Sequence, residues 1–168
     1  MTKRYEYFLD LSVFEQISPP MTVAPLQLRE VQPTDVNALA DLMIESYRGT
    51  IDYDGEGSEE AINEIQAYLA GERGGPPLLN ESRLVFAGPL LVGACLAAEW
   101  YERQLPLIAY VMIRAEWKNQ GVSKQVLWEV LQALRKQGHC EVRAVITEGN
   151  TPSERLFNHM GFQKIGIT

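Results

Sequence analysis

The sequence has few residues of the kinds that build cross-links, metal sites and membrane spans. It contains 2 cysteines and 2 histidines, and Cys95 and Cys140 both lie in apolar segments with no second ligand nearby. We therefore expect buried, reduced thiols in a cytoplasmic protein and no metal site. No apolar run approaches the roughly 20 residues of a membrane span. Glu6 and Asp10 interrupt the N-terminal segment, where a signal peptide needs a continuous apolar core, so we expect neither secretion nor a membrane partner.

Basic residues are also scarce, with 15 Lys and Arg against 22 Asp and Glu, a net charge of −7. Binding a polyanion usually needs a basic face, so this balance argues against nucleic acid as the main partner and favours a cationic one. The chain has 168 residues, of which 46% are apolar and 22% charged. This composition is typical of a soluble globular protein, and the length suits one domain that buries roughly 70% of its unfolded surface.

The hydrophobic pattern predicts strands first and helices alternating with strands later, which is a mixed α/β layout. A loose alternation at residues 5–13 is the first strand pattern. Asp35 and Ser58 are expected to cap the first two helices, and Gly138 and Gly161 to end the last two. Strands are expected at residues 5–13, 26–31, 83–87, 90–100, 107–113, 141–146 and 162–167, and helices at 36–47, 59–70, from 122 and from 151.

The run from Leu107 to Leu134 holds a buried strand, a polar turn and an amphipathic helix. The turn reads Lys118-Asn119-Gln120-Gly121-Val122-Ser123. A polar turn that feeds a helix N-terminus directs unpaired backbone N–H groups, with the positive end of the helix dipole behind them, at one point. Gly121 has no Cβ to obstruct an approaching group. The sequence therefore predicts a phosphate or another anion at this turn.

Two motifs in this sequence resemble those of the GNAT superfamily, the N-acyltransferases that use acetyl-CoA. The family pattern Q/R-x-x-G-x-G/A after a strand is similar to residues 118–123, with Lys118 at the basic position and Ser123 at the last small position. A second pattern, an Asn before a short helix and a closing Gly-Phe, is matched by Asn150 and Gly161-Phe162. The two stand in the family's order and spacing, and the likeness covers about residues 26–167.

The resemblance implies an α/β fold of the α+β type. It has a mixed, mostly antiparallel central sheet of six to seven strands, flanked by about four helices, and two parallel strands that splay apart to form the cofactor cleft. Residues 26–168 would form this GNAT acyltransferase domain, and residues 1–25 an N-terminal arm.

The resemblance also implies acetyl-CoA (coenzyme A) as cofactor. Backbone groups of Val111 and Ile113 would hold the pantetheine arm, amides from Asn119 to Lys124 the pyrophosphate, and Asn150 the arm from the other strand. The cofactor-binding positions expected in this way are Val111, Ile113, Lys118, Asn119, Gln120, Gly121, Val122, Ser123, Lys124, Asn150 and Phe157.

The catalytic groups are less clear, because this sequence departs from the family there. Family members often use a Glu on the central strand as base and a Tyr in the second motif as acid, and the matching positions are Ala109 and Phe157. Neither can transfer a proton. Glu99 on the preceding strand is the first candidate for the base and Tyr110 the second. The alternatives are a solvated residue at the end of a meander strand for Glu99 and a core residue for Tyr110.

Three residues of the acidic segment after the first helix are candidates for the acceptor pocket. Asp52, Tyr53 and Asp54 fall in the loop that covers substrate in the family, and the alternative is a solvated loop.

We expect an N-acetyltransferase that moves an acetyl group from acetyl-CoA to a primary amine by direct attack in a ternary complex. The acceptor can be a small amine, a peptide N-terminus or a lysine side chain. The alternative is an acyl-CoA-binding sensor with little catalysis. A Rossmann-like nucleotide module fits less well, because the turn lacks a GxGxxG run and a strand meander precedes it.

The N-terminal arm offers one more hypothesis. GNAT chains usually continue through a further strand after the one that follows the Gly-Phe motif, whereas this sequence stops at Thr168. Tyr5 to Leu11 can take the place of that last strand, either in its own subunit or in a partner, which would make a homodimer. The alternative is a mobile tail.

Overall fold

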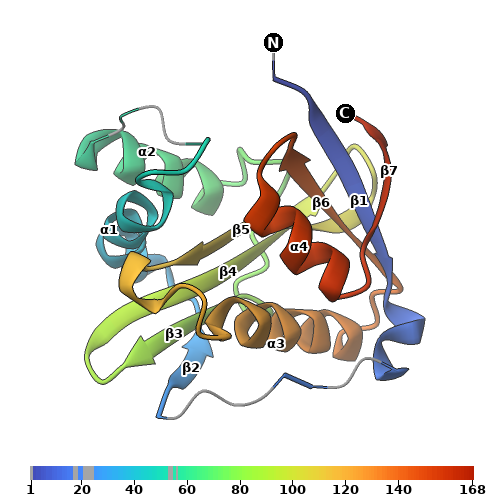
Figure 1. The fold of residues 1–168 in the computed structure, drawn as a ribbon, viewed down its shortest axis with the longest axis horizontal. Helices are drawn as coiled ribbons and strands as arrows, with labels where there is room; N and C mark the ends of the chain where they lie inside the picture. The colour runs from blue at the N-terminus through green and yellow to red at the C-terminus, as the bar shows by residue number, and fades with distance from the viewer. Residues whose placement is uncertain (1, 17–18, 21–24, 53–54, 56) are drawn as a thin grey trace.

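A computed structural model describes residues 2–16, 19–20, 25–52, 55 and 57–168. In these residues the chain forms one seven-stranded sheet with four α-helices (Figure 1). The strands are β1 (Arg4–Asp10), β2 (Gln27–Glu30), β3 (Arg83–Ala87), β4 (Leu90–Trp100), β5 (Leu105–Ile113), β6 (Glu141–Thr147) and β7 (Gln163–Ile167). The helices are α1 (Val36–Tyr47), α2 (Ser58–Leu69), α3 (Val122–Lys136) and α4 (Thr151–His159), and 3-10 turns occur at Leu11–Gln16, Pro33–Asp35 and Ala115–Trp117.

The strands lie in the order β2-β3-β4-β5-β6-β1-β7. Neighbouring strands are antiparallel except β5 and β6, which are parallel. The expected mixed, mostly antiparallel sheet with one parallel pair is therefore confirmed. None of the described helices is both long and apolar enough to cross a lipid bilayer.

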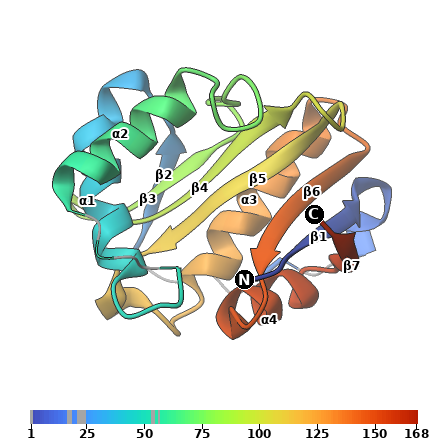
Figure 2. The same cartoon turned by 90° about the horizontal axis from the view of Figure 1, so that it is seen from above.

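The sheet separates two apolar layers (Figure 2). Helices α1 and α2 pack on one face, and α3 and α4 cover the other. Strand β4 contributes side chains to both layers, because successive side chains of a strand point to opposite faces. Cys95 and Ala97 pack toward α3, whereas Ala94, Leu96 and Ala98 pack toward α1 and α2. This accounts for the uninterrupted apolar run of β4, which is buried on both sides.

Strand β1 lies between β6 and β7 and is antiparallel to both, with Arg4 opposite Thr147 and Tyr7 opposite Lys164 (Figure 1). Tyr7 and Leu9 are 2% exposed and join the α3 layer. The strand places its alternate residues, including Glu6, on the other face. The division of the chain into an arm of 25 residues and a domain stays a prediction.

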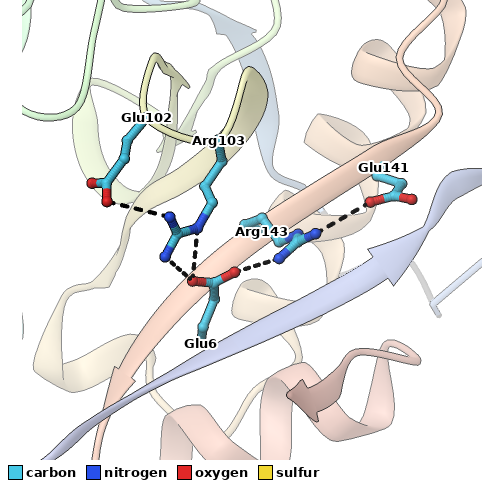
Figure 3. A network of polar contacts seen from close by, with 5 residues as sticks. All are labelled: Glu6, Glu102, Arg103, Glu141 and Arg143. Carbon is cyan, nitrogen blue, oxygen red and sulfur yellow. Dashed lines mark hydrogen bonds and ion pairs between the residues drawn. The ribbon is translucent and has the colours of Figure 1, made fainter. Parts of the chain in front are cut away.

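Glu6 holds β1 to the rest of the sheet through a network of charges (Figure 3). Its side chain is only 8% exposed and lies between two guanidinium groups. Arg103, in the turn between β4 and β5, donates to Glu6 Oε1 at 3.1 and 3.2 Å, and Arg143 of β6 donates to Oε2. A buried carboxylate is costly unless it is paired in this way. Glu102 and Glu141 extend the network outward.

Three local expectations are wrong. The N-cap of α2 is Gly57, not Ser58, because the Glu60 carboxylate accepts the Gly57 N–H at 3.0 Å. Cys140 is exposed, since it lies in the turn between α3 and β6 before the strand begins. The first strand ends at Asp10 and not at residue 13. Asp10 there accepts hydrogen bonds from the backbone N–H and hydroxyl of Ser12, which favours a turn.

Candidate active site

The parallel strands β5 and β6 pair over a very short distance and then part (Figure 2). Their partners are Leu107 with Arg143 and Ile108 with Ala144. The antiparallel register between β5 and β4 shifts at the same point. Leu96 pairs with Tyr110, whereas the next residue, Ala97, pairs with Ile108. Ala109 is therefore the extra residue of a β-bulge. Bulges bend a strand and end pairing, and they are common beside active sites.

A cleft of about 1160 Å³ opens where the two strands part. Ligand pockets typically measure roughly 300–1,000 Å³, so this one suits a large ligand. Helices from both faces of the sheet contribute to its wall. The described residues that line the cleft include 107–111 of β5, 144–147 of β6, Arg4 of β1 and Trp100 of β4, with Met43, Ile44 and Tyr47 from α1, Glu60, Ala61, Asn63 and Glu64 from α2, and Asn150, Ser153 and Phe157 at α4.

The α4 wall contains two of the expected cofactor residues. Asn150 is the N-cap of α4, and its Oδ1 accepts the Ser153 N–H at 3.3 Å. Its Nδ2 donates to the Asp52 carboxylate on the opposite wall at 2.9 Å. Phe157 is 5% exposed and packs edge-on against Phe162, with ring centroids 4.9 Å apart. The structure therefore brings Asn150, Phe157 and Asp52 into one cleft, with the Asn150 amide already hydrogen-bonded.

The β5 wall contains one of the two residues expected to hold the arm by backbone groups. Val111 lines the cleft beyond the point where β6 diverges. Ile113 is not among the described residues that line it, and its N–H donates to the Ser46 hydroxyl of α1 at 3.0 Å. The backbone edge of β5 is thus open to the cleft at Val111.

The turn before α3 has the form expected for an anion site. Asn119 and Gly121 adopt left-handed conformations, with φ of 62° and 84°, so that the chain turns tightly into the helix. The first backbone N–H groups of a helix have no partner within it. Gln120 lies within this turn, and Val122, Ser123 and Lys124 form the first turn of α3. Residues 118–124 do not appear among the described residues that line the cleft, so the turn lies outside it.

Gly93 allows the turn to pack closely on the sheet. A Cβ at this position would lie 3.0 Å from Ile113 Cδ1 and 3.3 Å from Val122 Cγ1. Val122, the first residue of α3, is 1% exposed. The absence of a side chain at Gly93 therefore sets where α3 begins relative to β5.

Lys118 makes a contact that the sequence did not predict. Its Nζ donates to the Ser46 carbonyl near the C-terminus of α1 at 2.6 Å. Burial lowers the pKa of Lys118 from its usual value, because the charged ammonium loses solvation. Lys118 lies four residues before Val122, the first residue of α3. The negative end of the α1 dipole favours the positive charge of the Lys118 ammonium group.

The two candidate catalytic residues lie in different places. Tyr110 lines the cleft next to the bulge, and the ring of Tyr68 packs edge-on against it at 5.9 Å. Glu99 is half-buried near the end of β4, where its N–H donates to the Pro76 carbonyl at 2.8 Å. Glu99 does not belong to the described part of the cleft wall.

The part of the cleft near Asp52 and α2 contains charged residues that sequence reasoning missed. Asp52 lines it as expected, whereas Tyr53 and Asp54 lie outside the described residues. Glu64 of α2 and Arg73 of the following loop also line it, and Arg73 Nε donates to both Glu64 oxygens at 2.7 and 2.8 Å. One signal was available, since Glu64 lies four residues before the buried Tyr68 and hence on the same helix face.

The fold and the cleft together define the class: the chain has the GNAT acyltransferase fold, and residues 92–168 match the family model described as FR47-like protein. The resemblance inferred from the two motifs is therefore confirmed at the level of the fold. Comparison with curated protein sequences finds no match.

Solved structures share the fold at low sequence identity. A GCN5-related N-acetyltransferase from Sphaerobacter thermophilus is 20% identical with a TM-score of 0.71, and the match covers 99% of this chain and 49% of that one. The chain thus spans about half the length of this relative. YncA, a putative acetyltransferase from Salmonella typhimurium with its cofactor acetyl-CoA, is 14% identical over 82% and 79% of the two chains, with a TM-score of 0.62. AAC(6')-Iy in complex with the bisubstrate analogue CoA-S-monomethyl-acetylneamine is 14% identical over 83% and 92%, with a TM-score of 0.63.

Proposed function

We propose that the protein is an N-acetyltransferase that moves an acetyl group from acetyl-CoA to a primary amine. One observation carries the proposal. The parallel strands β5 and β6 part immediately after Ile108 and Ala144, at the bulge of Ala109, and a cleft opens between them. The structures from Salmonella and of AAC(6')-Iy, which hold acetyl-CoA and a CoA bisubstrate analogue, share this fold.

The groups around the cleft fit the parts of acetyl-CoA. The edge of β5 at Val111 offers backbone groups for the amides of the pantetheine arm, since β6 no longer pairs there. The turn before α3 offers helix N-terminal amides for the pyrophosphate, and Lys118 and Lys124 add positive charge near it. Phe157 offers an apolar wall, and Asn150 can bind the arm after it exchanges its contact with Asp52.

The reaction requires an amine to attack the thioester carbonyl and a thiolate to leave. A backbone N–H at the bulge near Ala109 can stabilise the negative charge that develops on the carbonyl oxygen, without any particular side chain. Holding both substrates in one cleft supplies part of the acceleration, since proximity contributes roughly 7–11 kcal/mol in favourable cases. Tyr110 is the cleft-lining candidate for proton transfer. Glu99, the first candidate from the sequence, takes second place here because it does not belong to the described part of the cleft wall, and an unchanged rate in Glu99→Gln at every pH would remove it.

A sensor that binds acyl-CoA with little catalysis is the second candidate function. It is favoured by Ala109 and Phe157, which stand where the resembling family often has its base and acid. Phe157 is packed against Phe162 and cannot donate a proton.

Two measurements test the proposal. Acetyl-CoA should raise the melting temperature and NAD should not, because only a ligand of the native state stabilises it. Release of free thiol should then depend on an added amine, tested with a small amine, a peptide N-terminus and a lysine side chain. Stabilisation without thiol release from any amine would favour the sensor. Stabilisation by neither compound would contradict both functions.

A further inference from the structure

A buried polar cluster fixes helix α2 against strand β4. The Tyr68 hydroxyl donates to the Ala97 carbonyl at 2.6 Å, and the Ser82 hydroxyl accepts the Ala97 N–H at 2.8 Å. Tyr68 and Ser82 are both fully buried. Strand β3 begins only at Arg83, so beyond it the Ser82 hydroxyl serves as acceptor for the Ala97 N–H, and the Ala97 carbonyl accepts from the Leu78 N–H as well as from Tyr68. The position of α2 over the sheet is therefore set by directed hydrogen bonds as well as by packing.

This attachment places Glu64 at the cleft. Glu64 lies one helical turn before Tyr68 and on the same face, so it stands over the part of the sheet next to Ala97. Its carboxylate is 27% exposed, and Arg73 Nε contacts both of its oxygens at 2.7 and 2.8 Å. The loop that carries Arg73 is fixed in turn, since the Gly74 carbonyl accepts the Tyr101 N–H at 3.1 Å. The carboxylate is thus held in one orientation.

Tyr110 lines the same cleft as this ion pair, on the sheet side. It lines the cleft on β5 next to the bulge, and Tyr68 packs edge-on against its ring. Burial raises the pKa of Tyr110 above its usual value, the charge and hydrogen bonding of Glu64 raise it further, and those of Arg73 lower it. Tyr47 of α1 also lines the cleft, and burial raises its pKa as well. Tyr110 therefore stays a neutral phenol at ordinary pH, and a tyrosinate is not available as base.

We propose that Tyr110 and Glu64 together remove the proton from the attacking amine, with Arg73 as a positioning residue that keeps the Glu64 carboxylate aimed at the Tyr110 hydroxyl. This rests on the proposed function. The amine nitrogen bonds to the carbonyl carbon, the C–S bond breaks and its electron pair leaves on sulfur. The N–H proton moves to Tyr110 Oη as the phenolic proton moves to a Glu64 oxygen. Tyr110 gives up one proton as it takes another, so it never carries a charge. It can therefore transfer a proton although its surroundings disfavour the tyrosinate.

The relay also uses the partial exposure of Glu64. A carboxylate that takes a proton during each turnover must return it, and the outer side of Glu64 reaches solvent while Tyr110 faces the cleft. The pair thus performs the task for which neither Ala109 nor Phe157 has a suitable group.

Kinetics of five variants and one control test the relay. Glu64→Gln and Tyr110→Phe should each lower kcat by roughly 10²- to 10⁴-fold, the usual contribution of general acid–base catalysis, with the KM for acetyl-CoA unchanged. The double variant should be no slower than the slower single one, because both residues act in one step. Arg73→Lys should retain more activity than Arg73→Gln, since it keeps a cation beside Glu64. The matched control is Glu45→Gln, which removes the exposed Arg48 ion pair on α1 outside the cleft.

A spectroscopic titration tests the same contact without turnover. Ultraviolet absorbance of tyrosinate, compared with Tyr110→Phe, isolates Tyr110, and its titration should move to lower pH in Glu64→Gln and stay in place in Glu45→Gln. An active wild type with unaffected Glu64→Gln kinetics, or effects of the two variants that multiply, would overturn the relay alone. A wild type that releases no thiol with any amine would overturn the proposed function and the relay together.

Discussion

The Asn150 side-chain amide donates to the Asp52 carboxylate over 2.9 Å and so joins the segment after α1 to the N-terminus of α4 across the cleft. Gly149 and Ile51 also lie close together, since a Cβ built on Gly149 would lie 3.9 Å from Ile51 Cδ1. The amide that the GNAT resemblance assigns to the pantetheine arm is thus already in use. Under the proposed function, binding of the arm at Asn150 would replace this hydrogen bond by another.

The Asp52→Ala substitution should therefore strengthen acetyl-CoA binding. It frees the Asn150 amide, and one hydrogen bond of about 1 kcal/mol corresponds to roughly fivefold in affinity. Titration calorimetry measures the change. Ser153→Ala is a suitable control, since Asn150 accepts from the backbone N–H of Ser153 and not from its hydroxyl. Weaker binding to the Asp52 variant would show that the carboxylate does not compete with the arm.

Gly93→Ala should weaken acetyl-CoA binding and lower stability. The new Cβ meets Ile113 Cδ1 at 3.0 Å and Val122 Cγ1 at 3.3 Å, so the start of α3 must shift. Overpacking of this kind costs about 1–3 kcal/mol. Thermal melts with and without acetyl-CoA report both effects. Gly166→Ala on β7, which meets nothing within 4 Å, is the control, and equal behaviour of the two variants would contradict this explanation.

Glu6→Gln should destabilise the protein by about 2–3 kcal/mol, because two guanidinium groups then surround a buried neutral amide. An amide also presents an NH₂ donor to one of the two arginines, where the carboxylate presents acceptors to both. Urea unfolding measures the loss. Glu102→Gln removes another partner of Arg103 but at a side chain that is 71% exposed. A loss at Glu102 as large as that at Glu6 would contradict the role assigned to burial.

The Arg29 and Asp35 pair should make part of the stability depend on pH. Hydrogen bonding from Arg29 lowers the pKa of Asp35, with a further contribution from the Gln32 N–H. A lowered carboxyl pKa stabilises the fold above the unfolded value of about 3.9, and this contribution is lost as pH falls through the folded pKa. Asp35→Asn should cost about 1 kcal/mol at pH 7, reduced because the Arg29 side chain is 43% exposed.

The stability difference from the wild type should therefore shrink as acid is added, as urea melts at several pH values can measure. Asp41→Asn provides a control at a carboxylate that is 64% exposed. A difference that is the same at low and neutral pH would exclude the ionised Asp35 pair as its source.

The order of the helices and strands could be predicted because each element carries its own pattern. The apolar stripe of α3 and the turn residues around Gly121 are local features, and periodicity reveals them directly. The central β5 strand and its following turn could likewise be placed, and the two motifs tied them to a known fold. What periodicity could not provide was the contact between Asn150 and Asp52, which joins loops 98 residues apart in sequence.

The positions of Glu64 and Arg73 at the cleft could be predicted less well, because they too depend on contacts between distant parts of the chain. Glu64 follows Glu59 and Glu60 in an acidic helix, where a carboxylate is expected to face solvent, and Arg73 lies in a glycine-rich loop. Only the tertiary anchor at Tyr68 turns Glu64 toward the cleft. Cys140 was misplaced because its apolar neighbours in sequence belong to a helix and a strand, whereas it lies in the turn between them.

The position of β1 also governs when the protein can finish folding. The ribosome makes Arg4–Asp10 before every other strand of this sheet, whereas its two neighbours in the sheet, Glu141–Thr147 and Gln163–Ile167, follow more than 120 residues later. During synthesis the tyrosine-rich segment has no partner, and Tyr7 and Leu9 remain uncovered. Closing such distant contacts is slow, and an unpaired apolar strand is prone to aggregate. The β6-β1-β7 half of the sheet, which includes one wall of the cleft, can therefore form only after the last strand has emerged.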